Sequence, residues 1–325
     1  MTKGNSVTSG TQYGNFVRGN RDKLMISYRR ESSHDYTMLG ACSVLFENKI
    51  HFFGGNDPSP NGFYAYYYDY NELDYDNSLN DFTRQHFVIE TQRSGQLIKM
   101  TRKEDLEIGF LVPACSSFEI KSKHFPWFKT NVVILCFGSD KKACYSFDGK
   151  LTYIGDSNFS HDQARLTKYN GNLLTIGDIF KTNWKTEIMK MDENKNFNWS
   201  VVESIFNFFG NDMILYRYSL VTVEYSDFNE EYVLLISEGK VFKFDGTWFP
   251  FGKLKKPRYE QNAIFWNGAL YIIGGRVETD EKMKMEIWNV KDSPHEFTTT
   301  ENWPQLFDWK LPHLLIVPDS FFPDY

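Results

Sequence analysis

Short apolar segments recur along the chain in pairs, and each pair is joined by a tight polar turn. In the clearest pair, residues 262–275, two apolar runs flank Asn267-Gly268 and the second run closes on Gly274-Gly275. Asn-Gly between apolar runs favours a hairpin with a type I′ turn, because both central residues of that turn need a positive φ. The pattern therefore predicts two antiparallel strands that end at a glycine pair.

Four further copies of this hairpin occur along the chain. Residues 164–178 carry Asn170-Gly171 between two apolar runs, and residues 43–55 carry Asn48-Lys49 at the corresponding place. Weaker copies span residues 116–138 and 219–237. Self-similarity at a regular spacing, here about 50 residues, is typical of proteins built from stacked repeats.

A second hairpin with its own pattern follows each copy. Residues 241–245 lead through Gly246 to Trp248, and residues 188–192 lead through a polar turn to Trp199. Related segments occur at residues 87–100, 144–154 and 287–297. The predicted unit is therefore four strands: an inner hairpin that ends in glycine and an outer hairpin that ends near an aromatic residue.

This unit resembles the kelch repeat, in which a Gly-Gly hairpin precedes an apolar-x-apolar-Asp turn and then Trp. The glycine pair is complete in two copies, half kept in two and lost in one: Gly54-Gly55, Gly274-Gly275, Gly177-Asp178, Gly138-Ser139 and Ile236-Ser237. The resemblance covers roughly residues 40–325. It implies an all-β fold, a kelch-type β-propeller of about six four-stranded blades.

The ends of the chain suggest how such a ring closes. Only one apolar segment, Leu314 to Val317, follows the fifth unit, so the last blade needs a strand from the other terminus. We expect Leu24 to Tyr28 to supply that N-terminal strand, residues 1–20 to form a flexible tail, and residues 21–325 to form the propeller. The long first interval predicts an insertion at residues 56–81 in the first blade, rich in Tyr and acidic residues.

Composition agrees with an all-β chain and disfavours several partners. Aromatic residues make up 17% of the chain, which favours strands. The net charge of −6 and the lack of long Lys/Arg runs argue against nucleic-acid binding. No apolar run is long enough to cross a membrane. We expect a cytoplasmic protein, because no signal segment begins the sequence, with secretion as the alternative if such a segment is missing from it.

Cysteines and asparagines carry two weaker signals. Cys42 and Cys115 stand in the same tripeptide at the same place in two units, so a disulfide is conceivable, but two small buried thiols are the favoured interpretation. The sequons Asn158-Phe159-Ser160 and Asn198-Trp199-Ser200 are interpreted as chance matches, because no signal segment precedes them.

No pattern in the sequence selects a catalytic site. The seven His residues show no metal-ligand spacing, and nucleophile-elbow, phosphate-loop and dinucleotide motifs are missing. Ser146-Phe147-Asp148-Gly149 lacks the residue between Asp and Gly that sialidase turns contain. Trp199, Trp248 and Trp288 are expected to fill the space between blades. We therefore expect no enzyme activity and no cofactor.

Kelch propellers often display Arg, Tyr and polar residues in the segment that leads into each first strand. The matching positions here form the predicted binding site: His161, Gln163, Arg165, Arg217, Tyr218, Arg258 and Tyr259. The expected function is a monomeric protein-protein interaction module, a scaffold or adaptor that binds a protein or peptide at the propeller face. The alternative is a galactose oxidase-like or lectin-like propeller that binds or acts on carbohydrate.

Overall fold

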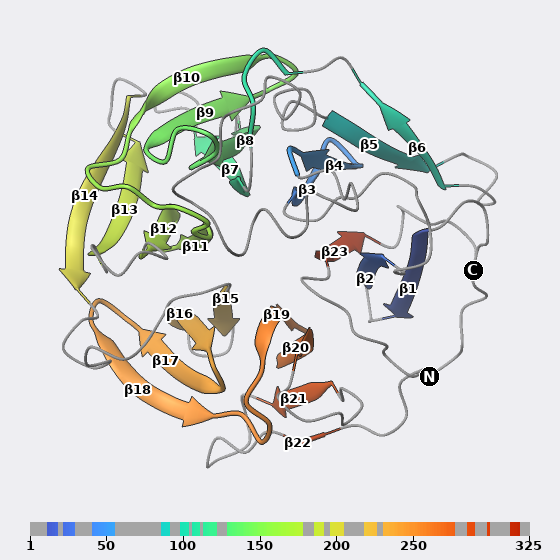
Figure 1. Cartoon of the computed structure of the whole chain (residues 1–325), viewed down its shortest axis with the longest axis vertical. Helices are drawn as coiled ribbons and strands as arrows, with labels where there is room; N and C mark the ends of the chain where they lie inside the picture. Colours follow the sequence, from blue (N-terminus) through green and yellow to red (C-terminus); the bar gives the residue numbers. More distant parts are fainter. Residues whose placement is uncertain are drawn as a thin grey trace, which may run out of the picture.

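In a computed structural model the chain is all-β, and its sheets are arranged around a ring as in a β-propeller (Figure 1). The structure describes residues 12–18, 22–29, 41–55, 86–91, 98–103, 106–110, 113–121, 129–177, 185–191, 196–204, 218–225, 230–276, 285–289, 298–299 and 313–318. Within these ranges, five sheets have four strands and one has three.

The four-stranded sheets are named I to V in chain order, and the three-stranded one is the closing sheet. Their strands are β3 (Cys42–Phe46), β4 (Lys49–Phe53), β5 (His86–Thr91) and β6 (Ile98–Arg102) in sheet I; β7 (Ala114–Lys121), β8 (Lys129–Cys136), β9 (Ala143–Phe147) and β10 (Leu151–Asp156) in sheet II; β11 (Thr167–Tyr169), β12 (Asn172–Ile176), β13 (Lys185–Met191) and β14 (Phe197–Ser204) in sheet III; β15 (Ser219–Tyr225), β16 (Glu230–Ser237), β17 (Lys240–Phe244) and β18 (Trp248–Lys253) in sheet IV; β19 (Tyr259–Trp266), β20 (Ala269–Arg276), β21 (Glu286–Asn289) and β22 (Thr298–Thr299) in sheet V; and β1 (Gln12–Arg18), β2 (Asp22–Arg29) and β23 (His313–Pro318) in the closing sheet.

Each four-stranded sheet is an antiparallel meander, as the four-strand unit predicts. The first strands lie toward the centre of the ring and the fourth strands lie at its rim (Figure 1). Neighbouring sheets contact one another mainly near the centre of the ring: β3 contacts β7, β7 contacts β12, β11 contacts β15, β15 contacts β19, and β23 contacts both β19 and β3. The contacts run all the way round, so the ring is closed.

The inner hairpins turn as their sequences require. Asn170 and Gly171 have φ values of 48° and 71°, and Asn267 and Gly268 have φ values of 50° and 75°, so both pairs occupy two-residue turns with positive φ. In sheet I the prediction was one residue out of place. Phe46 pairs with Lys49, so the turn consists of Glu47 and Asn48, both with positive φ.

The closing sheet joins the two ends of the chain. Leu24 of β2 pairs with Ile316 of β23, and Ile26 pairs with Leu314, so the predicted N-terminal strand does complete this sheet. The prediction of a tail over residues 1–20 was wrong for Gln12–Arg18, which form β1 and pair with β2. The polar, glycine-containing composition of this segment hid the strand, because its backbone pairing with β2 carries the structure. The predicted insertion at residues 56–81 lies outside the described residues.

Large aromatic side chains fill the space between sheets. Trp248 and Trp288 are almost fully buried, each in an apolar cluster that joins two neighbouring sheets, and half-buried Trp199 packs against a third cluster. The packing role predicted for these three residues is confirmed. The glycine at the end of an inner hairpin is needed for the same close packing. A Cβ atom added to Gly54 (φ +67°) would lie 2.1 Å from the carbonyl oxygen of Phe110.

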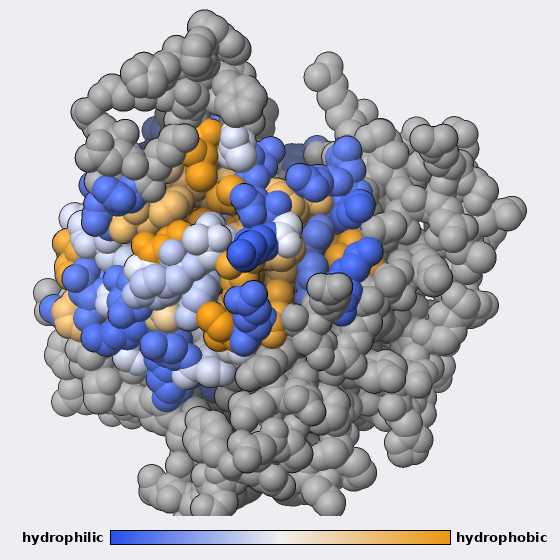
Figure 2. Space-filling view, turned by 90° about the horizontal axis from the view of Figure 1, so that it is seen from above, coloured by the Kyte–Doolittle hydropathy of each residue, from blue (hydrophilic) through white to orange (hydrophobic). Residues whose placement is uncertain are grey.

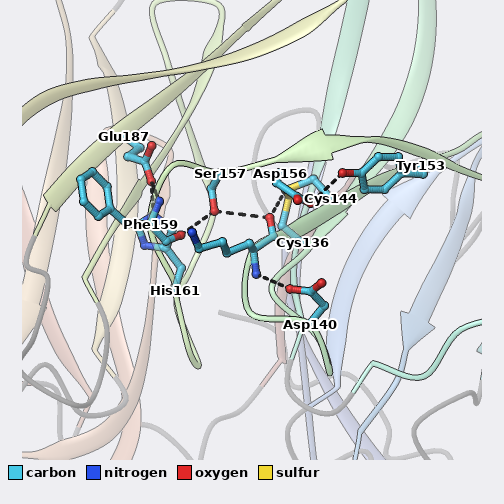
Figure 3. The surroundings of a disulfide bond; sticks show 10 residues. Cys136, Asp140, Cys144, Tyr153, Asp156, Ser157, Phe159, His161 and Glu187 are labelled. Atoms are coloured by element: carbon cyan, nitrogen blue, oxygen red, sulfur yellow. Dashed lines mark hydrogen bonds and ion pairs between the residues drawn. A yellow bond between two sulfur atoms is a disulfide. The ribbon is translucent and has the colours of Figure 1, made fainter.

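Two disulfides stabilise sheets I and II. Cys42 of β3 and Cys115 of β7 are bonded across the two neighbouring inner strands, with their Cα atoms 5.7 Å apart. Cys136 of β8 and Cys144 of β9 are bonded within sheet II, where the two residues pair directly (Figure 3). The interpretation of Cys42 and Cys115 as two buried thiols was wrong, because the ring brings the two first strands to a separation that suits a disulfide.

Candidate functional site

Two of the predicted binding residues lie at the centre of buried polar networks. His161 and Arg258 stand in the segments that lead into sheets III and V, and both side chains have no exposed surface. Each one contacts a buried carboxylate on the third strand of the sheet that follows it, Glu187 on β13 and Glu286 on β21. The two networks are built in the same way.

In the first network, Glu187 receives four hydrogen bonds. Its Oε1 accepts from the backbone N–H of Asn158 (3.1 Å) and from the side-chain Nδ2 of the same residue (2.7 Å). Its Oε2 accepts from the N–H of Phe159 (3.1 Å) and lies 2.6 Å from Nε2 of His161. The other ring nitrogen of His161 lies 2.8 Å from the carbonyl oxygen of Gly177. The ring of His161 therefore lies between a carboxylate and a backbone carbonyl.

In the second network, Glu286 takes the place of Glu187. It accepts from the backbone N–H groups of Lys255 (2.9 Å) and Lys256 (3.2 Å), and Nη2 of Arg258 donates to it over 2.6 Å. Nη1 of Arg258 lies 3.4 Å from the carbonyl oxygen of Gly274. In both networks, therefore, one carboxylate binds two consecutive N–H groups and the side chain two residues further on. That side chain also reaches the carbonyl of a glycine, Gly177 directly after β12 or Gly274 near the end of β20. We call these two residues the end glycines.

The equivalence extends to the strand pairing. Glu187 pairs with Thr175 and Glu286 pairs with Ile272, and each of these partners lies two residues before the glycine. We call this place on the third strand the corner position. In sheet II, the residue at the corner position by the same pairing is Cys144, which pairs with Cys136. Sheet IV lacks the glycine, and there we assign the corner position to Phe242, because Phe242, like Glu187, directly follows the shift in pairing with the fourth strand. An irregularity in the pairing of the third and fourth strands lies beside it in sheets II, III and IV, where a bulge redirects side chains.

Sequence reasoning missed both glutamates, although a signal was present. Each stands directly before the isoleucine that begins the repeated outer hairpin, as Glu187-Ile188 and Glu286-Ile287. His161 and Arg258 both precede the end glycine by the same interval, 16 residues. Aligning the copies on that glycine would have placed His161 opposite Arg258, and both outer hairpins would then show a glutamate before the isoleucine.

Burial and hydrogen bonding compete at these groups. Burial opposes ionisation of Glu187, but the hydrogen bonds from His161, Asn158 and the N–H of Phe159 outweigh it, so the pKa of Glu187 falls below its ordinary value. Burial lowers the pKa of Arg258, and the neighbouring Glu286 opposes that shift. Arg258 keeps its charge because a guanidinium has a very high pKa to begin with.

Two further predicted residues also lie inside the fold. Tyr218 is buried, and its hydroxyl donates to the carbonyl of Ile176 at the end of β12 and accepts from the N–H of Arg165. Gln163 is buried too, with a φ of 55°. These contacts join the segment leading into sheet III to the start of sheet IV, so they connect neighbouring sheets.

The predicted binding site is thus mostly interior. His161, Gln163, Tyr218 and Arg258 are buried, so the expectation that they are displayed on the surface was wrong. Side chains that the kelch pattern places before a first strand turn inward here, because the buried carbonyl and carboxylate groups beside them need donors. Arg165 is half-buried. Arg217 and the side chain of Tyr259 lie outside the described residues, and the backbone of Tyr259 begins β19.

A different group of side chains is accessible on sheet II. Tyr153 of β10 is 55% exposed, and its hydroxyl donates to Oδ1 of Asp156 over 2.7 Å (Figure 3). The ring of Tyr145 lies edge-on to it, with 5.6 Å between the centroids. Asp140 and Asp156 are exposed beside the two rings. We call these four residues the tyrosine surface.

The two aspartates of the tyrosine surface help to raise the pKa values of its two tyrosines. Burial, followed by the charges of Asp140 and Asp156, raises the pKa of Tyr145. The hydrogen bond to Asp156 is the main cause that raises the pKa of Tyr153. Both rings therefore stay neutral at physiological pH beside two carboxylates, an arrangement that attracts cations. Figure 2 views the molecule from the side of β10, and hydrophobic residues there form small patches among hydrophilic ones.

A pair of stacked histidines lies in sheet I. Nδ1 of His51 on β4 lies 3.0 Å from Nε2 of His86 on β5, and the ring of His86 stacks on Phe53 with a centroid distance of 4.6 Å. Phe147 of sheet II packs edge-on against both histidines. Burial, then the nearby His51 and Lys103, lowers the pKa of His86 to about 4. The pair is therefore a buried contact between two sheets.

Within the described ranges, no group of three or more His, Cys, Asp or Glu side chains is placed to hold a metal ion. The same residues contain no helix with the length and apolarity to cross a membrane. Comparison of the chain with known protein families and with curated proteins finds no match in either set.

Proposed function

We propose that the chain is a six-bladed kelch-type propeller. In this proposal, each of the five four-stranded sheets is one blade and the closing sheet is the sixth. The glycines that end the inner hairpins support it, since Gly54, Gly55, Gly274 and Gly275 all have positive φ as a kelch glycine pair requires. The repeated carboxylate networks add a second feature that recurs from one unit to another.

The proposed function is a protein-protein interaction module that works as a scaffold or adaptor and has no chemistry of its own. The observation that carries this proposal is the tyrosine surface, in which Asp156 holds the exposed ring of Tyr153 in place. Tyr is among the residues that contribute most to binding at protein interfaces. Two rings beside two carboxylates suit a Lys or Arg side chain, through cation–π contact and ion pairing, so the proposed partner is a protein or peptide that presents such a residue.

An affinity pull-down from the native source tests this function. Wild type and Tyr153→Ala are compared at equal concentration, and each captured protein is then titrated with the purified chain. Loss of a hot-spot tyrosine weakens binding about tenfold or more. The variant should keep the stability of wild type, because exposed substitutions usually change it by less than about 0.5 kcal/mol.

Matched variants separate the possible sites. Tyr153→Phe keeps the ring but loses the hydrogen bond to Asp156, so it should retain most of the affinity. Arg165→Ala probes the segment that leads into sheet III, and it should leave binding unchanged. A partner lost with Arg165→Ala but retained with Tyr153→Ala would move the site to the predicted lead-in segments. Failure to capture any partner would count against the adaptor function.

The tyrosine surface also favours one second function, carbohydrate binding. An exposed aromatic ring beside acceptor carboxylates suits stacking on a sugar ring and hydrogen bonds from its hydroxyl groups. Binding to an immobilised glycan panel that Tyr153→Ala abolishes, without any protein partner, would replace the adaptor proposal by this one.

We further propose that the protein resides in an oxidising compartment, in place of the cytoplasm expected from the sequence. Two disulfides support this proposal, because disulfides form and persist outside the reducing cytosol. Counting free thiols in protein isolated from its source under alkylating conditions tests it. No free thiol is expected, and four would contradict the proposal.

A further inference from the structure

The two sequons lie close together in the fold but differ in what surrounds them. Asn158 precedes sheet III, and Asn198 lies on β14, the last strand of that sheet. Both sequons contain Ser at the third position and no Pro at the second, so both satisfy the acceptor pattern for N-linked glycosylation. The local structure decides which one tolerates a sugar.

The side chain of Asn158 is part of the first carboxylate network. Its Nδ2 donates to Oε1 of Glu187 over 2.7 Å and to the backbone carbonyl of Trp199 over 3.2 Å. A glycan replaces one of the two hydrogens on this nitrogen, so one of the two contacts must break. The sugar would also have to occupy the space between Asn158 and the carbonyl or carboxylate that it now contacts. A glycan here opposes the fold.

Both asparagines are exposed, so the hydrogen bonds of Nδ2 are what set Asn158 apart. Asn198 pairs with Lys190 of β13 on the fourth strand of its sheet, which is attached to the sheet on one side only. Ser200, the third residue of its sequon, follows on the same strand, and its hydroxyl donates to the carbonyl of Ile188. The strand β14 is the rim strand of sheet III in Figure 1, and the side chain of Asn198 is exposed there.

The same strand carries an apolar surface that a glycan would cover. Val201 and Val202 are adjacent and 45% and 41% exposed, among the most exposed large apolar residues that the structure describes. An apolar edge strand is a template for pairing with another chain, and proteins protect such edges with bulky or charged groups. A glycan three or four residues away on β14 would protect this edge.

We infer that Asn198 carries an N-linked glycan and that Asn158 does not. The inference rests on the proposed oxidising compartment, since disulfide formation and N-glycosylation of Asn-x-Ser sites belong to the same secretory route. In the reaction, Nδ2 of Asn198 forms a bond to the anomeric carbon of an oligosaccharide carried by a lipid pyrophosphate. The bond between that carbon and the phosphate oxygen breaks, the lipid pyrophosphate leaves, and Nδ2 loses one proton.

Peptide mass mapping of the disulfide-bonded protein from its native source tests the inference. The peptide with Asn198 should carry a glycan mass, and peptide N-glycosidase should convert that residue to Asp. The peptide with Asn158 should have its unmodified mass before and after this treatment. Sugar on Asn158, or an unmodified Asn198 in a protein without free thiols, overturns the inference. An unmodified Asn198 together with four free thiols overturns the proposed compartment as well.

Matched variants give a second readout. Asn198→Gln and Ser200→Thr are compared in the same cells: the first should abolish the shift in electrophoretic mobility that glycosidase causes, and the second should keep it. Asn158→Gln should keep the full shift, and a lower unfolding midpoint would show the loss of its contacts with Glu187 and Trp199. A mobility shift that persists in Asn198→Gln contradicts the assignment to this residue.

Discussion

The corner position of the third strand contains a buried carboxylate in two sheets and an apolar or sulfur-containing side chain in two others. Glu187 and Glu286 bind the segment that leads into their own sheet, through two N–H groups and a basic side chain. Cys144 forms a disulfide with Cys136 of the neighbouring strand, and Phe242 packs in an apolar cluster with Trp248. All four residues pair with the second strand of their sheet.

This difference shows that the repeat preserves a geometry and not a set of residues. A buried carboxylate is stable only where donors surround it, so Glu at the corner position requires a lead-in segment that supplies N–H donors and a basic side chain. His161 and Arg258 meet that need, and they are among the residues that the sequence assigned to a partner. The polar residues of the lead-in segments are largely used by the fold, and the tyrosine surface on sheet II is available for binding.

The largest expected effect comes from breaking the second network. Arg258→Met keeps the aliphatic volume but leaves Glu286 buried without its cation, which should lower the free energy of unfolding by about 3–5 kcal/mol. Chemical denaturation at pH 7 measures it. Arg165→Met is the matched control, since Arg165 is only half-buried, and its effect should stay below about 1 kcal/mol. Equal effects for the two arginines would contradict the comparison.

The histidine pair of sheet I should make the stability of the protein depend on pH. The pKa of His86 is about 4 in the folded state against 6.5 in the unfolded state, so the unfolded chain binds a proton first as the pH falls. Stability should therefore decrease from pH 6.5 to about pH 4, by about 3 kcal/mol from this group. Unfolding free energies measured across this range in wild type and His86→Gln should diverge in slope, and parallel curves would exclude His86 as the cause.

Removing the disulfide of sheet II should have a smaller effect. Cys136→Ala/Cys144→Ala opens a short loop, because the two residues are separated by only 8 positions in the sequence. The loop-entropy relation gives a loss of about 2.5 kcal/mol. Thermal unfolding of the double variant under oxidising conditions measures the loss. The Cys42→Ala/Cys115→Ala variant opens a loop of 73 positions and should lose about 4 kcal/mol, so the reverse order would be evidence against the entropic cause.

The smallest expected effect is at the apolar corner position. Phe242→Leu removes part of a buried ring in an apolar cluster, and it should lower the free energy of unfolding by about 1 kcal/mol. Denaturant unfolding measures the change. Phe242→Glu, by contrast, places a carboxylate in the apolar cluster that contains Trp248, and it should be far more destabilising. A tolerated glutamate would mean that the corner position accepts an acid in any sheet.

Much of the fold was predictable from local signals. Asn267-Gly268 and Asn170-Gly171 specify their own turns, and the repeated hairpins specify the four-strand meander. The corner networks were harder to predict, because the partners of Glu187 and Glu286 become neighbours only through strand pairing. The disulfide between Cys42 and Cys115 likewise depends on how two sheets are placed in the ring, which spacing alone does not determine. The residues of β1 show no clear alternation of apolar and polar side chains, so the sequence pattern does not predict this strand. Its pairing with β2 defines it.

The most direct measurement is a double-mutant cycle on Arg258 and Glu286. The free energy of unfolding is determined for wild type, Arg258→Met, Glu286→Leu and the double variant. If the two side chains form a buried pair, the double variant is more stable than Arg258→Met alone, and the coupling energy is about 2 kcal/mol or more. A coupling energy below about 0.5 kcal/mol would mean that the two side chains act independently, and it would contradict the account of the second network.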